Sequence, residues 1–387
     1  MKRDIFILAR GVVLMAAGML LLMSLLLLVD LRHAGLPLEQ VSQFNIAEAR
    51  HLSNTLNRNF NQLTAVVFTT VAIAVPLTAN MYSVKFLELF IQDPVNAAVL
   101  TFVVFANLNN TWWAYGLKDN FVPVFQIYVS VILLIVCFAL LFPYLYYVFR
   151  FLHPNTLLLR LEKEISANLR AAGQRPARTA AYRQQVAEGI EHIANIAIRS
   201  IDRADRNTAI ESVLTLERVA RAYWSVKPRL APNWFGAESE TFLGFSAEAI
   251  EEIRASHSWV EMKLFSQLRQ VMSAALTRMH DLVSTGAESL RKVGLEDAAR
   301  CDVALREMVM EYFNTFIRLA LTRRDVRSVF VLFDQYRSFA EALNAESPDL
   351  VEEIAYYFEY YGQVARELQL NFVVESAAHD LGRLVQH

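Results

Sequence analysis

The stretch that decides the fold, residues 124–149, reads VFQIYVSVILLIVCFALLFPYLYYVF and holds no ionised side chain. It is longer than the roughly 20 apolar residues that a helix needs to cross the hydrocarbon core of a bilayer. Backbone polar groups find no water there, so a spanning stretch of this kind must be helical. The sequence therefore predicts a membrane-spanning helix over these residues.

Three further stretches toward the N-terminus have the same character, and none of them contains an ionised residue. These predicted spans are residues 11–29, 63–82 and 95–115. The first is too long for the apolar core of a cleaved signal peptide and no Ala-x-Ala site follows it, so we interpret it as an anchor. Residues 36–62 lie between the first two spans, and from about Ile46 their pattern predicts a helical segment on the outer side that can continue into the second span.

Charge divides the chain into two parts. Residues 1–150 hold nine Lys and Arg and seven Asp and Glu, whereas the remaining residues hold 28 and 32. We therefore predict a four-span transmembrane domain over residues 1–150 and a cytosolic domain over residues 151–387. The net charge of −2 offers no basic face for nucleic-acid phosphates, so no nucleic-acid partner is expected.

The distribution of Lys and Arg around the spans predicts the orientation. With the N-terminus inside, seven of these residues lie on the inner side near the membrane and four lie on the outer side. The inner group is Lys2, Arg3, Arg10, Lys85, Arg150, Arg160 and Lys163, and the outer group is Arg32, Arg50, Arg58 and Lys118. Four crossings then place both termini in the cytosol.

The second and third spans carry polar residues that the first span lacks. Thr70 and Thr78 lie in the second span among small residues, which let helices approach closely, and Pro76 predicts a kink. In the third span, five residues recur at helical spacing and share a face, namely Asn96, Leu100, Val103, Asn107 and Asn110. Amides at both ends and apolar side chains between them are the pattern of a pore lining in an oligomer. The alternative is that these amides bond to neighbouring helices.

The cytosolic part is helical throughout by pattern. A break at residues 173–176 separates its first two helices, and Pro and Gly make residues 227–245 a long connection. The expected helices cover residues 157–169, 179–200, 207–223, 247–256, 258–285, 286–293, 296–322, 325–345 and 348–385, the last one broken. Paired helices without strands predict an α-solenoid or a bundle, although no repeat period is evident. Near the end, Tyr356 and Tyr360 are expected to lie off the core-facing stripe of an aromatic-rich helix.

Two stretches carry a resemblance to a known family. Residues 78–93 read TANMYSVKFLELFIQD, and residues 190–200 read IEHIANIAIRS and are followed by matching residues at Asp205, Thr208, Ala209 and Glu211. Both resemble the bacterial membrane-protein family called domain of unknown function 2254. The second motif departs from the family at Ile201, Ala204 and Arg206, where the family has Pro, Asn and Pro. The resemblance implies a multi-pass protein of the bacterial inner membrane with a helical cytosolic domain, and it implies no known activity.

Catalytic motifs are missing from the sequence. It holds no phosphate loop, dinucleotide fingerprint, zinc-protease helix or nucleophile elbow, and its two Cys and scattered His predict no metal site and no cofactor. We expect the protein not to be an enzyme. A dense group of charges includes Arg199, Arg203 and Arg206, which could converge on a phosphate as an anion or regulatory site. Local ion pairs are the alternative explanation for this group.

Two functions fit these observations. The first is a homo-oligomeric, uncoupled pore with a cytosolic regulatory domain, because no carboxylate or cationic side chain lies inside the spans to relay a proton. The alternative is a non-conducting scaffold or accessory subunit of a larger membrane complex. The expected partners are the lipid bilayer, further copies of the chain and, through the cytosolic helices, other subunits.

Overall fold

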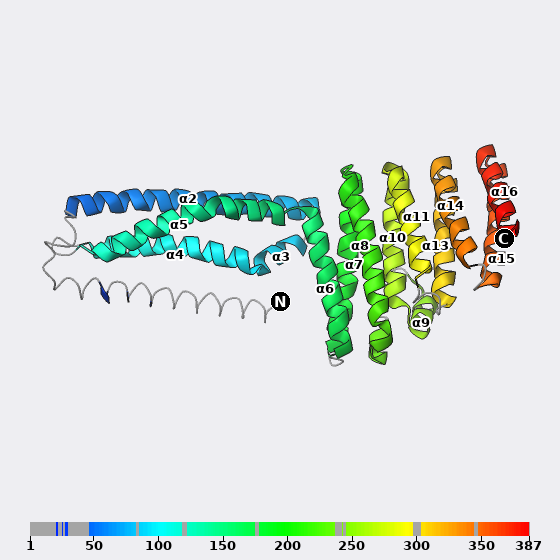
Figure 1. Cartoon of the computed structure of the whole chain (residues 1–387), viewed down its shortest axis with the longest axis horizontal. Coiled ribbons are helices and arrows are strands. Elements are labelled where there is room, and N and C mark those ends of the chain that lie inside the picture. Colours follow the sequence, from blue (N-terminus) through cyan, green and yellow to red (C-terminus); the bar gives the residue numbers. More distant parts are fainter. Residues whose placement is uncertain are drawn as a thin grey trace. The chain divides into compact units, whose positions relative to one another are not determined.

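A computed structural model describes residues 46–82, 85–117, 122–174, 178–236, 245–296, 303–343 and 347–386, together with Leu21, Leu25, Leu28, Val29 and Phe242. Every element in these residues is a helix (Figure 1), which confirms the all-α fold class. The chain divides into two compact units. The N-terminal unit is Met1–Asn80 with Val84–Leu152, and the C-terminal unit is Met81–Ser83 with His153–His387. The predicted first span lies outside the described residues, apart from the three leucines and Val29.

The longest helix of the N-terminal unit is α2, Ile46–Met81, with 36 residues. It joins the predicted outer helical segment, from Ile46 onward, to the predicted second span, so the continuation is confirmed. At 1.5 Å per residue it is roughly 54 Å long, which exceeds the roughly 30 Å hydrocarbon core of a bilayer. The helix runs through Pro76 without interruption, and the kink there stays a prediction.

Three more helices complete the described part of this unit: α3 at Lys85–Gln92, α4 at Pro94–Gly116 and α5 at Val124–Phe151. Among the described residues, two helices are long and apolar enough to cross a membrane, namely α2 and α5. Helix α4 is long enough too, but its asparagines lower its mean hydropathy. The count of four spans therefore stays a prediction.

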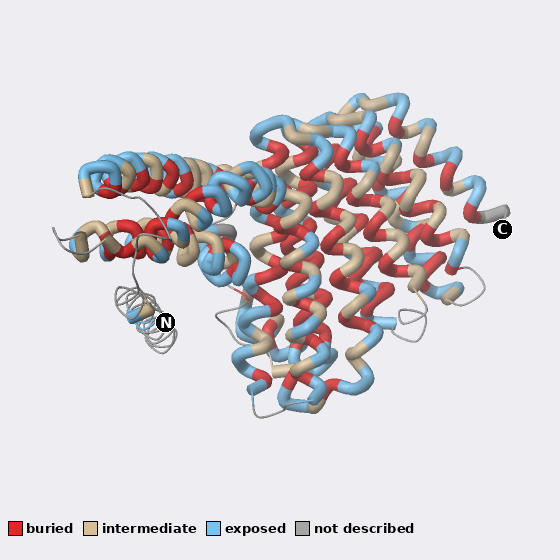
Figure 2. Tube along the Cα trace, turned by 60° about the vertical axis from the view of Figure 1, so that its left-hand side comes forward, coloured by how far each residue is buried: buried red, intermediate tan, exposed pale blue. Residues whose placement is uncertain are grey.

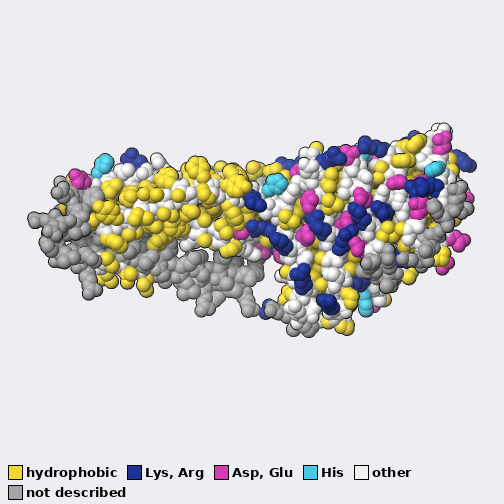
Figure 3. Space-filling model, in the orientation of Figure 1, with side chains coloured by type: hydrophobic (Ala, Val, Ile, Leu, Met, Phe, Trp, Pro, Cys, Tyr) yellow, Lys and Arg dark blue, Asp and Glu magenta, His cyan; other side chains and the backbone are white. Residues whose placement is uncertain are grey.

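The outward surfaces of α2 and α5 are apolar. Ile73 and Leu77 on α2 are exposed, as are Ile135 and Phe142 on α5. Figure 3 shows hydrophobic side chains covering long stretches of these helices. A water-soluble protein does not expose an apolar surface of this extent without a partner, so these helices have the surface that contact with lipid requires.

The described part of the C-terminal unit consists of helices and contains two 3₁₀ turns, Lys227–Arg229 and Pro232–Phe235, which lie in the predicted long connection. Its helices are α6 at Pro154–Gln174, α7 at Thr179–Asp202, α8 at Arg206–Val226, α9 at Ala247–Ala255, α10 at Trp259–Arg278, α11 at His280–Gly294, α13 at Val303–Thr322, α14 at Val326–Leu343, α15 at Pro348–Glu367 and α16 at Asn371–Gln386.

Four helical hairpins stack side by side in this unit to form an α-solenoid. They are α7–α8, α10–α11, α13–α14 and α15–α16, and the main helix contacts lie within a hairpin or between neighbouring hairpins. One layer therefore holds α7, α10, α13 and α15, and the other holds α8, α11, α14 and α16. Helix α6 packs on both helices of the first hairpin. Buried residues lie along the surfaces where the helices face one another (Figure 2).

Three of the hairpins have turns of the same backbone conformation. This structural repeat is not visible in the amino-acid sequence. Ala204, Arg324 and Gln369 have φ of 58°, 57° and 59°. In each case the next residue donates its backbone N–H to the carbonyl five positions earlier, at 2.9–3.0 Å. A left-handed residue at a helix end is commonly glycine, and these positions lack that signal.

Several predicted helix boundaries in this unit were wrong. Helix α6 extends beyond the predicted residues 157–169 at both ends and includes the first two residues of the predicted break at 173–176. Helix α8 begins at Arg206, because Asp205 accepts the backbone N–H of Thr208 at 3.2 Å, whereas the predicted start was at Asn207–Thr208. The break between α10 and α11 lies at Met279, not at residues 285–286. Gly286 lies inside α11, where an added Cβ would collide with the sulfur of Met272. It allows close helix packing and does not end a helix.

Candidate functional site

The predicted stripe of α4 faces the interior of the N-terminal unit. Asn96 and Asn110 are 1% and 0% exposed, and Val103 is also buried. Leu100 and Asn107 are half-buried. The common face that helical spacing predicted is therefore present, and it packs against helices of the same chain.

At one end of the stripe, amides join α4 to α2. The Nδ2 of Asn107 donates to the Oδ1 of Asn61 at 3.0 Å and to the hydroxyl of Thr64 at 3.4 Å. The Nδ2 of Asn110 donates to the Oδ1 of Asn57. Asn57, Asn61 and Thr64 share one face of α2 by their spacing of four and three. These three partners were not predicted from the sequence, although their spacing is a signal that could have identified them.

A second polar contact joins α4 to α5. The Oγ of Ser130 accepts from the Nδ2 of Asn109 at 3.1 Å and from the Nε1 of Trp113 at 2.8 Å. All three side chains are fully buried. Asn109 lies off the predicted stripe, but it shares a face with Trp113, four residues later.

The other end of the stripe is fixed by an acidic residue that ends the first family-like stretch. Asp93 accepts the backbone N–H groups of Val95 and Asn96 at 3.1 and 3.2 Å, and the hydroxyl of Tyr147 donates to it at 2.8 Å. The Nδ2 of Asn96 donates to the carbonyl of Phe90 at 3.2 Å. Asp93 thus caps α4 and ties α3, α4 and α5 together. The Asp-Pro pair at the start of α4 is a cap signal that the sequence analysis did not use.

The two threonines predicted with this stripe lie on α2. Thr70 is half-buried, and the hydroxyl of Thr78 donates to the carbonyl of Ala74 at 2.9 Å, one turn earlier in the same helix. On α4, each of Asn96, Asn109 and Asn110 keeps a buried Oδ1 without a hydrogen-bond partner in the described part of the chain. Each of these three amides can therefore still accept one donor, such as a water molecule.

The predicted anion residues lie where α7 ends and α8 begins. Arg199 is half-buried, and Arg203 and Arg206 are exposed. One terminal nitrogen of Arg206 lies 3.8 Å from a carboxylate oxygen of Asp281 on the next hairpin. For Arg206 this favours the local ion pair over convergence on a phosphate, and the anion site stays a prediction.

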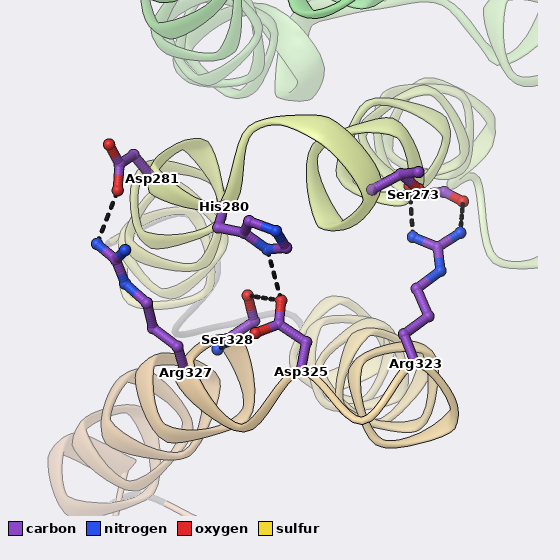
Figure 4. Close-up of polar contacts among 8 residues, drawn as sticks. Ser273, His280, Asp281, Arg323, Asp325, Arg327 and Ser328 are labelled. Carbon is purple, nitrogen blue, oxygen red and sulfur yellow. Dashed lines mark hydrogen bonds and ion pairs between the residues drawn. The ribbon is translucent and has the colours of Figure 1, made fainter.

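Polar contacts join the hairpins α10–α11 and α13–α14 close to the left-handed turn of α13–α14 (Figure 4). The Nδ1 of His280 lies 2.7 Å from the Oδ2 of Asp325, and a nitrogen of Arg327 lies 2.8 Å from the Oδ1 of Asp281. Burial raises the pKa of Asp325, but hydrogen bonds from Ser328 and His280 outweigh it, so the pKa is lowered from its usual value. No His in the sequence pairs with another at helical spacing, and the His280–Asp325 contact joins residues 45 positions apart.

Comparison with known proteins agrees with the membrane assignment. Residues 7–187 match the family described as a predicted membrane protein (DUF2254). No curated protein and no solved structure matches the chain. The match includes the first family-like stretch, residues 78–93, and ends before the second, residues 190–200. The protein is therefore a membrane protein whose residues 7–187, slightly less than half of the chain, are similar to the family called domain of unknown function 2254.

Proposed function

We propose that the protein is a non-conducting, non-enzymatic scaffold or accessory subunit of a complex in the bacterial inner membrane. In this proposal the N-terminal helices cross the membrane several times and hold the chain there. The α-solenoid lies in the cytosol with both termini and binds other subunits. Stacked helical hairpins of this kind present extended binding surfaces.

The bonding of the amide stripe carries the proposal. A pore in a homo-oligomer needs these amides to face a water-filled lumen between subunits. Asn96 and Asn110 are instead buried within one chain and donate to Phe90 and Asn57. Close packing of small residues and interhelical hydrogen bonds between polar side chains both contribute to helix association in lipid. The stripe is therefore better explained as a link between helices than as a lumen.

Exposed aromatic side chains near the end of the solenoid support a partner surface. Tyr356 and Tyr360 lie four residues apart on α15 and are 63% and 41% exposed, whereas Phe358 and Tyr361 on the same helix are buried. This arrangement agrees with the predicted stripe. Tyrosine is enriched in the buried cores of protein interfaces, so we propose this face of α15 as the contact for another subunit.

The pore remains the second candidate, because Leu100 and Asn107 of the stripe are only half-buried. Replacing Asn107 by Leu separates the two functions. If the amide links helices, Asn107→Leu lowers the thermal midpoint of the purified protein in detergent, and wild-type protein gives no current in planar bilayers. Leu108→Ala, at an exposed neighbour on the same helix, should change neither result.

The opposite outcome would establish the pore. It consists of a wild-type current that Asn107→Leu alters while the thermal midpoint stays unchanged. The oligomeric state in detergent is a second measurement, because a monomer cannot form a pore from so few helices.

The partner surface has its own test in native membranes. Wild-type protein should copurify with a stoichiometric partner of another sequence, and the double variant Tyr356→Ser/Tyr360→Ser should lose it. Phe372→Ser is the control, since Phe372 is also exposed but lies on α16 in the other layer. Equal retention by both variants would contradict the proposed contact.

A further inference from the structure

A pocket with an excess of positive charge opens on one layer of the solenoid. It has a volume of about 540 Å³ and lies among α7, α10 and α13, the first helices of three consecutive hairpins. Arg269, Arg278 and Arg323 line it together with a single carboxylate, Asp202. None of the arginines predicted to bind an anion lines this pocket. Its residues come from three separate segments, so sequence spacing could not bring them together.

Two of the three guanidinium groups keep their charge unbalanced. Arg278 is paired with Asp202. Arg323 is held by neutral acceptors, since its two terminal nitrogens donate to the backbone carbonyl of Ser273 at 2.6 Å and to the Ser273 hydroxyl at 3.2 Å (Figure 4). Arg269 is exposed, and in the part of the chain that the structure describes it has no carboxylate within ion-pair distance.

This arrangement suits a phosphate group. A guanidinium donates two parallel hydrogen bonds to phosphate oxygens, and two unbalanced positive charges match the charge of a phosphate monoester, close to −2 at neutral pH. Ser273 holds Arg323 in place without neutralising it, which orders the donor before a ligand arrives.

The pocket is larger than one phosphate ion needs. Small-molecule sites range over about 300–1,000 Å³ and combine apolar walls with a few placed polar groups. Here Ile198, Ala274 and Leu319 supply apolar wall, and Thr277 supplies a hydroxyl. We propose that this pocket binds an organic phosphate, with Arg269 and Arg323 on the phosphate and the apolar wall against the organic body.

Binding at this place would act on the solenoid as a whole. The ligand would bridge three hairpins that otherwise contact only their neighbours, and it would stabilise their present arrangement by mass action. Arg323 lies two residues before Asp325, which takes part in the contacts between the second and third hairpins. An organic phosphate is thus suited to regulate the binding surface of the solenoid, whatever partner that surface takes.

The test is isothermal titration of the full-length protein in phosphatidylcholine nanodiscs. The probes are inorganic phosphate, adenosine 5′-monophosphate and, as the phosphate-free control, adenosine. We expect adenosine monophosphate to bind and adenosine not to bind, with an affinity that falls as salt concentration rises. If neither phosphate probe binds, or if adenosine binds equally well, the proposal is wrong.

Variants connect the binding to the pocket. Arg269→Gln should weaken binding about tenfold, because a charge-assisted hydrogen bond is lost. Arg366→Gln removes the same charge from an exposed position on α15 outside the pocket, and it should change the affinity by less than about twofold. Asp202→Asn should tighten binding, because it releases Arg278. Equal affinities of Arg269→Gln and Arg366→Gln would overturn the assignment.

Two further titrations identify whether the natural ligand is a lipid headgroup, a free metabolite or an acidic protein segment. Adding phosphatidic acid to the nanodiscs should weaken binding of adenosine monophosphate if the natural ligand is a lipid headgroup, and should leave it unchanged if the ligand is a free metabolite. A glutamate-rich peptide tests for an acidic protein segment. Binding of that peptide that depends on Arg269, without any phosphate binding, would contradict the proposal.

Discussion

Helices α5 and α13 distribute their apolar and polar side chains between exposed and buried faces in opposite ways. Helix α5 exposes Ile135 and Phe142 and buries Gln126 and Ser130, whereas α13 buries Phe313 and Phe316 and exposes charged residues, including Glu307 and Arg318. In lipid, apolar burial gives helices little reason to associate, so polar contacts and close packing select the partner. In water, apolar burial supplies most of the stability. The two units of this chain thus depend on different interactions.

The largest expected effect compares two phenylalanines. Phe316 is 0% exposed in the core of the solenoid, and Phe142 is 76% exposed on α5. Phe316→Ala should lower the free energy of unfolding by about 3–5 kcal/mol. Phe142→Ala should change it by less than about 0.5 kcal/mol in detergent. Urea unfolding of the full-length protein, followed by tryptophan fluorescence, measures both. Equal losses would contradict the contrast between the units.

A pair of glycines tests how tightly the C-terminal unit is packed. A Cβ added to Gly294 would lie 2.7 Å from a ring carbon of Phe339 and 3.0 Å from Val309, whereas one added to Gly382 would meet nothing within 4 Å. Gly294→Ala should therefore cost about 1–3 kcal/mol through overpacking. Gly382→Ala, in an exposed part of α16, should stabilise by about 0.5–1 kcal/mol. The same unfolding measurement should give opposite signs for the two variants.

Ser130 tests the role of polar contacts in the N-terminal unit. Ser130→Ala removes the acceptor of two buried donors, on Asn109 and Trp113. We expect a loss of about 1–2 kcal/mol, read as a lower thermal midpoint in detergent. The control is Ser225→Ala, whose exposed hydroxyl bonds only to the carbonyl of Ala222 one turn earlier. If the two variants behave alike, polar bonds do not determine how α4 and α5 associate.

The smallest expected effect is a change in stability at low pH. The pKa of Asp325 is lowered in the folded protein, so its ionised form favours folding. That contribution is present above the unfolded pKa, about 3.9, and disappears as the pH falls through the lower folded value. Asp325→Asn should reduce stability by less than about 1 kcal/mol at neutral pH, and the difference from wild type should shrink below about pH 4. A difference that grows in acid would contradict the assignment.

Much of the architecture could be predicted from local sequence pattern. The length of the apolar run predicted α5. Helical spacing placed Asn96 and Asn110 on one face and Tyr356 and Tyr360 off the core stripe. These predictions held because each depends on residues within a few turns of one helix. The sequence also allowed an α-solenoid, but it gave no period because non-glycine residues occupy the repeated left-handed turns.

The remaining features depend on contacts between distant segments. Asn107 forms a hydrogen bond with Asn61, which lies 46 residues earlier in the sequence. The pocket brings together Arg269 and Arg323, which belong to two different hairpins. No spacing rule along one helix encodes such pairs. The break at Met279 was misplaced at residues 285–286. Gly286 lies there inside a helix, and the residue that it contacts, Met272, is on the facing helix.

The stacking of hairpins also determines which parts of the C-terminal unit unfold locally most easily. Because stability in such an array is the sum of each hairpin and its interfaces with adjacent ones, the hairpin α15–α16, with a neighbour on one side, should exchange its amide hydrogens fastest. The central hairpins, α10–α11 and α13–α14, should exchange most slowly. The chain therefore has a gradient of local unfolding, in which the tyrosine-bearing end can rearrange while the arginine-lined middle keeps its form.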